Sequence, residues 1–98
     1  MTYWFADLGN LGEGKTVEVS ISDSANIRIM DAENFQKFKK NQIHEFIGGY
    51  VKFTPYTMKL PRAAHWLVVV DIGEHEHKIE AKASVYQRER KVKIERFL

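Results

Sequence analysis

His65-Trp66-Leu67-Val68-Val69-Val70-Asp71-Ile72 is the most apolar stretch of the chain, and it decides the fold. The side chains from Trp66 to Val70 are all large and apolar, so neither face of an extended strand would be polar. This pattern is typical of a strand in the middle of a sheet that is covered on both faces. We therefore expect a buried central strand with other structure packed on either side.

Outward from this stretch, apolar and polar residues alternate with the period of half-buried strands. Val17 and Val19 alternate with Glu18 and Ser20, and similar patterns predict further strands around 27–29, 44–53 and 56–60. Gly48-Gly49 interrupts the 44–53 pattern, which indicates a bulge, a bend or a close backbone approach. Residues 77–86 alternate as well, and a turn at 73–76 would join them to the apolar strand as a hairpin.

One helix is expected near residues 31–40. Asp31 is a good N-cap, and Phe35 and Phe38 lie three residues apart on one helical face. The sequence therefore predicts an all-β fold of at least six strands, a small sandwich or closed barrel, with this one short helix. The residues expected to share its core are Trp66, Val68, Val70, Phe35, Phe38, Val17 and Val19.

The composition excludes several classes of protein. The 98 residues fit one domain, and with no cysteine the chain has neither disulfides nor thiolate zinc sites. No apolar run approaches the length of a membrane span, and the first residues lack the pattern of a signal peptide. We expect a cytoplasmic protein that does not insert into membranes.

The basic character lies at the end of the chain. The formal net charge is +2, and residues 87–98 carry five Lys or Arg against two Glu, which leaves −1 for the rest. We divide the chain into a β domain at 1–86 and a basic extension at 87–98, a strand or a helix, packed or partly exposed. A net charge of +3 is small for a nucleic-acid binder, so nucleic acid is not an expected partner.

Several short segments between about residues 7 and 86 follow one another in a characteristic order and spacing. These segments are Gly14–Val19, Ala25–Asp31, Asn34-Phe35, Gly48-Gly49-Tyr50, Thr54-Pro55, Leu60-Pro61 and His65–Gly73. In their order and spacing, the middle of the chain resembles a bacterial family known only as domain of unknown function 1883. Two positions depart from the family pattern: Ser24 replaces a usual glutamine, and 74–77 replaces a glycine-rich hairpin.

The resemblance implies an all-β fold with one short helix. It also implies that relatives occur as small stand-alone proteins and as fusions to TIR domains of bacterial, defence-related proteins. It supplies no catalytic residues that can be transferred to this chain.

A metal site is the first functional hypothesis. His75 and His77 would share one side of a strand, and Glu74, Glu76 or a distant His65 would be further ligands. In the alternative interpretation, His75 and His77 lie in a solvated hairpin tip. We favour this alternative because the sequence has no third ligand at a fixed spacing from the two histidines. The sequence indicates no catalytic residues, no metal site and no cofactor.

A ligand site beside the helix is the second hypothesis. A helix N-terminus presents free N–H groups that favour an anion, and amides and a histidine can read a nucleotide-like ligand. The residues expected to line such a site are Asn26, Asp31, Asn34, His65 and Tyr50. Asp31 argues against a phosphate here because its carboxylate can itself cap the helix. In the alternative interpretation, Asn26 and Asn34 stabilise a turn, and Trp66 is a core residue whose indole N–H is bonded locally.

The leading functional hypothesis is a non-enzymatic recognition module that binds a small ligand or a protein partner. It rests on the absence of a catalytic constellation, on a scaffold that presents loops and on the TIR fusions that the resemblance implies. Two alternatives remain: a small metal-dependent barrel enzyme using His75 and His77, and a structural oligomerisation domain. The open edge strand of a small sheet is a natural seam for a homo-oligomer.

Overall fold

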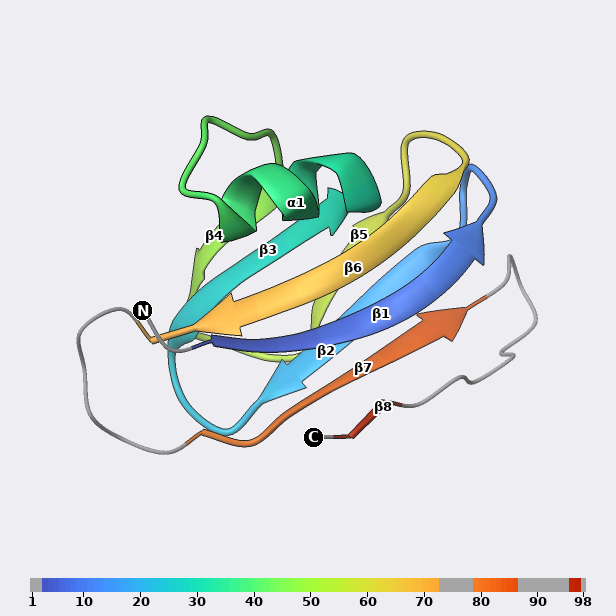
Figure 1. Ribbon diagram of the computed structural model, residues 1–98. Coiled ribbons are helices and arrows are strands. Elements are labelled where there is room, and N and C mark those ends of the chain that lie inside the picture. The colour runs from blue at the N-terminus through green and yellow to red at the C-terminus, as the bar shows by residue number, and fades with distance from the viewer. Residues whose placement is uncertain (1–2, 73–78, 87–95, 98) are drawn as a thin grey trace.

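The computed structural model describes residues 3–72, 79–86 and 96–97, and their strands form two antiparallel four-stranded sheets packed face to face (Figure 1). The first sheet has the order β1 (Tyr3–Leu11), β6 (Ala64–Asp71), β3 (Ala25–Asp31), β4 (Ile47–Val51). The second has the order β5 (Tyr56–Lys59), β2 (Thr16–Ile21), β7 (Ala81–Tyr86), β8 (Arg96–Phe97). The described strands thus confirm the sandwich and not the closed barrel.

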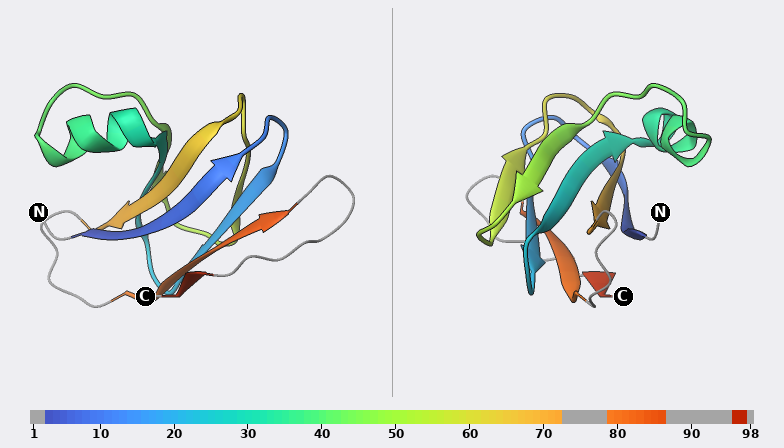
Figure 2. Two further views of the ribbon diagram at one scale, coloured as in Figure 1. Left: turned by 45° about the vertical axis from the view of Figure 1, so that its right-hand side comes forward. Right: turned by 90° about the vertical axis from the view of Figure 1, so that its left-hand side faces the viewer.

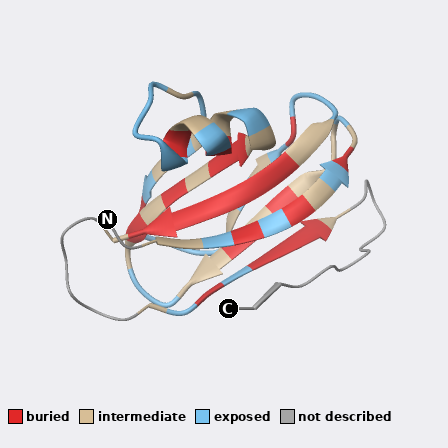
Figure 3. Ribbon diagram, in the orientation of Figure 1, coloured by how far each residue is buried: buried red, intermediate tan, exposed pale blue. Residues whose placement is uncertain are grey.

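β6 lies between β1 and β3 and is buried on both faces (Figure 3). Trp66, Val68 and Val70 point into the core between the sheets. Leu67 and Val69 point outward and lie under the helix, in a second apolar cluster. The predicted central strand is confirmed, and the indole N–H of Trp66 is bonded locally, to the carbonyl oxygen of Arg62 at 3.1 Å.

The helix α1 (Ala32–Lys39) covers the outer face of the first sheet (Figure 2). It begins at Asp31 as predicted, and Phe35 and Phe38 are its buried residues. The expectation of one shared core is wrong for these two rings. They pack with Met30, Leu67 and Val69 outside the sandwich, because the helix follows β3 on the face away from the second sheet.

The predicted hairpin between the apolar strand and residues 77–86 is wrong. β6 pairs with β1 and β3, whereas β7 pairs with β2 and β8 in the other sheet. β6 needs strands on both sides and cover on both faces, whereas the alternating pattern of β7 suits a sheet with one buried face. The proposed turn itself falls within 73–78, outside the described residues.

The strand β1 was not predicted from the sequence. Its register with β6 shifts between Asp7 and Gly9, so Leu8 and Leu11 are both buried although they are three residues apart. Such a bulge breaks the period-2 alternation that reveals strands. The proposed strand in the tail lies in 87–95, outside the described residues, and Arg96–Phe97 forms β8 next to β7. The domain boundary at 86 stays a prediction.

Gly48 and Gly49 lie inside β4 and do not end it. Their φ angles are +126° and +154°, which non-glycine residues rarely adopt. A Cβ at Gly48 would lie 2.2 Å from the carbonyl oxygen of Ile27, whereas one at Gly49 would meet nothing within 4 Å. The close approach of β4 to β3 therefore requires glycine at position 48 more strictly than at position 49.

Gly48→Ala should destabilise the protein by at least about 3 kcal/mol, because the strain of a positive φ adds to a clash with backbone. Gly49→Ala is the matched control, and it should cost only the backbone strain, about 1–3 kcal/mol. Urea unfolding of both variants measures the difference. Equal losses would mean that the clash at Gly48 is relieved by movement of β4.

Trp66→Ala should cost about 3–5 kcal/mol, because it removes a large side chain that is 2% exposed from the inter-sheet core. Chemical denaturation checks this value. A loss below about 1 kcal/mol would contradict the assignment of Trp66 to the core.

Candidate functional site

The start of α1 is held by a network around Asp31. Its Oδ1 accepts hydrogen bonds from the backbone N–H and from the side-chain amide of Asn34, both at 2.9 Å. Its other oxygen forms an ion pair with Arg62. Asn34 Oδ1 in turn accepts the N–H of Glu45 at 2.9 Å, which ties the loop after the helix to its first turn.

A pocket of about 180 Å³ lies beside this network. Asp31, Asn34, Phe46, Arg62 and Trp66 are among its lining residues. Ligand pockets usually measure roughly 300–1,000 Å³, and the polar atoms named above are already bonded to one another. The polar groups that line this pocket therefore stabilise the helix start, and they are not arranged to bind a ligand.

Asp31 is ionised more readily than a free aspartate. Burial raises the pKa of its carboxyl group, but the hydrogen bonds and charge of Arg62 and the two bonds from Asn34 outweigh burial, so the pKa lies below its usual value. The negative charge that caps the helix is thus present at neutral pH, where it would repel a phosphate.

This shift predicts a pH dependence of stability. Because the pKa of Asp31 is lower in the folded than in the unfolded chain, its contribution is fully present above the unfolded value. It is lost as the pH falls through that value toward the folded pKa. Asp31→Asn should remove this part of the acid dependence and cost about 1 kcal/mol at pH 7, because the negative charge at the helix N-terminus and the ion pair with Arg62 are lost. Urea unfolding between pH 7 and pH 2 tests it, and identical pH profiles for variant and wild type would contradict it.

The structure separates the five residues predicted to line a ligand site. Asp31 and Asn34 lie together at the helix start, whereas Asn26 and Tyr50 lie opposite each other at the far end of β3, about 17 Å away for five strand residues. His65 lies on β6, where its Nε2 is 2.6 Å from Asp7 Oδ1. The five side chains do not surround one cavity, and their role as ligand contacts stays a prediction.

An ion pair on the outer face of the first sheet was not predicted from the sequence. Arg28 forms an ion pair with Asp71, whose side chain is 1% exposed, and Asn26 donates to the same carboxylate at 3.1 Å. The guanidinium of Arg28 lies 5.8 Å from the ring centre of Phe38 and 5.3 Å from that of Phe46. The available signal was an arginine in the middle of an apolar strand, together with an aspartate at the end of the most apolar one.

Exposed apolar side chains are concentrated on and around β4. Among the residues the structure describes, five large apolar side chains are exposed, and four of them fall within residues 43–53. We call these four the β4 surface: Ile43 (97% exposed), Phe46 (44%), Tyr50 (63%) and Phe53 (85%). β4 is also an edge strand, paired only with β3 among the described strands. Its other edge presents backbone groups that can receive a further strand.

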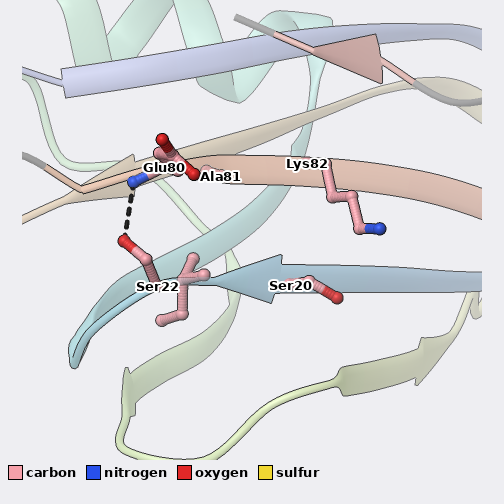
Figure 4. Close-up of a pocket in the computed structure, with 6 residues that line it drawn as sticks. Ser20, Ser22, Glu80, Ala81 and Lys82 are labelled. Atoms are coloured by element: carbon pink, nitrogen blue, oxygen red, sulfur yellow. Dashed lines mark hydrogen bonds between the residues drawn. The ribbon is translucent and has the colours of Figure 1, made fainter.

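A second pocket lies where β2 and β7 run side by side (Figure 4). It measures about 350 Å³, and its lining includes Ser20, Ser22, Glu80 and Lys82. The Ser22 hydroxyl accepts the N–H of Glu80 at 2.8 Å, and the N–H of Ser22 donates to the Glu80 carbonyl oxygen at 2.9 Å. These bonds extend the pairing of the two strands and give Ser22 a structural role.

The metal hypothesis falls outside what the structure describes, because His75 and His77 lie in 73–78. Within the described ranges, no three His, Cys, Asp or Glu side chains gather where they could hold a metal ion. In the same residues, no helix has the length and apolar character that crossing a membrane requires.

Comparison with protein families identifies the chain. The model of the family named Domain of unknown function (DUF1883) matches residues 1–89. The chain belongs to this family. As a DUF1883 domain it has the all-β fold with one short helix that the resemblance implied. Searches of curated proteins and of solved structures gave no significant match.

Proposed function

We propose that this DUF1883 domain is a non-enzymatic recognition module that binds a protein partner through the β4 surface. The observation that carries the proposal is the concentration of exposed apolar side chains on one edge strand and its two flanking segments. Large exposed apolar patches on soluble domains mark interaction sites, and aromatic side chains are enriched among the residues that dominate binding.

The chemistry of an edge strand supports this mode of binding. An extended segment that adds to β4 would gain backbone hydrogen bonds, and Phe46 and Tyr50 would contact its side chains. The surface is also ordered in advance. Phe46 lies against Arg28, which Asp71 anchors, and the preceding residue is bonded to Asn34. Order before binding lowers the entropy cost of association.

A small, nucleotide-like ligand is the weaker candidate. The pocket at the helix start is small, its carboxylate already caps the helix, and Asn26 and His65 are engaged with Asp71 and Asp7. A docking role also fits the TIR fusions that the resemblance implies, since a domain joined to an effector commonly provides recognition. We place this activity in the bacterial cytoplasm as part of the proposal.

Site-specific photo-crosslinking tests the proposed surface. Phe53, which is 85% exposed, is replaced by p-benzoylphenylalanine in cells that express the full chain. The matched control carries the same group at Gln36, an exposed position on α1 outside the β4 surface. We expect a covalent protein adduct at position 53 and none at position 36. With both proteins purified, Tyr50→Lys should raise the dissociation constant for the identified protein at least about tenfold.

Two outcomes would contradict the proposal. One is equal crosslinking at both positions. The other is calorimetric binding of a cyclic nucleotide or an NAD-derived compound that is lost in Asn34→Ala or His65→Ala, together with no adduct at position 53. The second outcome would favour the small-ligand function.

A further inference from the structure

We infer that the partner of the β4 surface is a second copy of this chain, with the two β4 strands paired antiparallel about a twofold axis at Gly49. The inference rests on the proposed function, because it names the occupant of the same surface. It joins the first sheets of two copies, four strands from each, into one continuous sheet.

The register follows from the limits of the strand. β4 spans Ile47–Val51, so its central residue is Gly49. Complete overlap of two antiparallel copies places Gly49 opposite Gly49, Gly48 opposite the second copy's Tyr50, and Ile47 opposite the second copy's Val51. Opposite residues of an antiparallel pair share a face of the sheet, so this register keeps the outer and inner faces of both copies aligned.

The outer face is self-complementary in this register. Tyr50 would lie across from Gly48, the position where the nearby Ile27 carbonyl oxygen excludes any side chain. The glycine leaves room for the 63%-exposed tyrosine ring to lie on the backbone of the second copy. Covering an edge glycine with an aromatic ring is a known way to stabilise paired strands.

The flanking residues extend this complementarity. Continued by one residue at each end, the register places Phe46 opposite the second copy's Lys52, and both side chains are exposed. An ammonium group close to an aromatic ring is favourable. Phe46 already receives Arg28 of its own copy, so it is held in place for this contact.

The inner face is apolar. Ile47 packs against the inter-sheet core, and Val51 belongs to that core. Their alignment across the axis would continue the core from one copy to the next. The short strand limits the contact area, and small interfaces are typical of weak association, so we expect a dimer that dissociates at about micromolar concentration.

Sedimentation velocity tests the inference across concentrations from about 1 µM to 1 mM, bracketing the weak affinity expected of a small interface. Wild type should shift from monomer to dimer within this range. Tyr50→Lys should raise the dimer dissociation constant at least about tenfold, because it removes the ring and adds two positive charges close to the axis. Gln36→Lys is the control. It adds the same charge at an exposed helix position outside the β4 surface, and it should leave the dimer unchanged.

Disulfide trapping tests the register. The chain has no cysteine, so Phe46→Cys and Lys52→Cys each introduce a single thiol. Opposite residues of paired strands have Cα atoms about 4.5–5.5 Å apart, within the range of a disulfide. An equimolar mixture of the two variants, one of them tagged, should form mixed disulfides under mild oxidation. Each variant alone should not, because two copies of residue 46 would be about 20 Å apart in this register.

The results separate this inference from the proposed function. A monomeric wild type up to 1 mM, a dimer insensitive to Tyr50→Lys, or disulfides between identical variants would each overturn the inference. The photo-crosslinker at position 53 could then still capture another protein, and Tyr50→Lys could weaken the binding of that protein after purification. In that case the recognition function would stand with a different partner. If the chain neither dimerised nor gave a crosslinked protein at position 53, both proposals would be rejected.

Discussion

Five consecutive large apolar side chains in β6 need cover on both faces, and most of the architecture meets this requirement. On one face the second sheet supplies Val17, Val19 and Val85, and on the other α1 supplies Phe35 and Phe38. Neighbouring strands on both sides satisfy the backbone of β6. A strand so enclosed cannot also form a hairpin with β7, so the following segment passes to the other sheet.

Two polar networks of the domain lie at the two ends of β3. At one end Asp31 caps the helix and binds Arg62, and at the other Asp71 binds Arg28 and Asn26. Both carboxylates are thereby engaged in stabilising the outer layer. This arrangement explains why a site that looked suitable for an anion in the sequence is instead a capped helix end.

The β4 surface combines order with exposure. The guanidinium of Arg28 lies against the ring of Phe46, and Gly48 allows β4 to approach β3 closely. The side chains of Tyr50 and Phe53 remain exposed. An edge strand with these properties invites pairing, and natural sheets usually protect such edges with charge or proline. In the paired arrangement that we infer, the same glycine that permits the close approach of β3 and β4 also makes room for the tyrosine of a second copy.

The sequence by itself determined the elements whose signal is local. The apolar run revealed β6, the Asp31 cap and the Phe35–Phe38 spacing revealed α1, and alternation revealed β2 and β7. Only the tertiary structure decided which strands pair, because the hydrogen bonds of a sheet join residues distant in the chain. It separated β6 from β7, revealed β1 despite its bulge, and divided the predicted core into two layers. It also placed Asn26 on β3, Asn34 on α1 and His65 on β6, and the distances between these elements depend on strand register and packing, which no local pattern encodes.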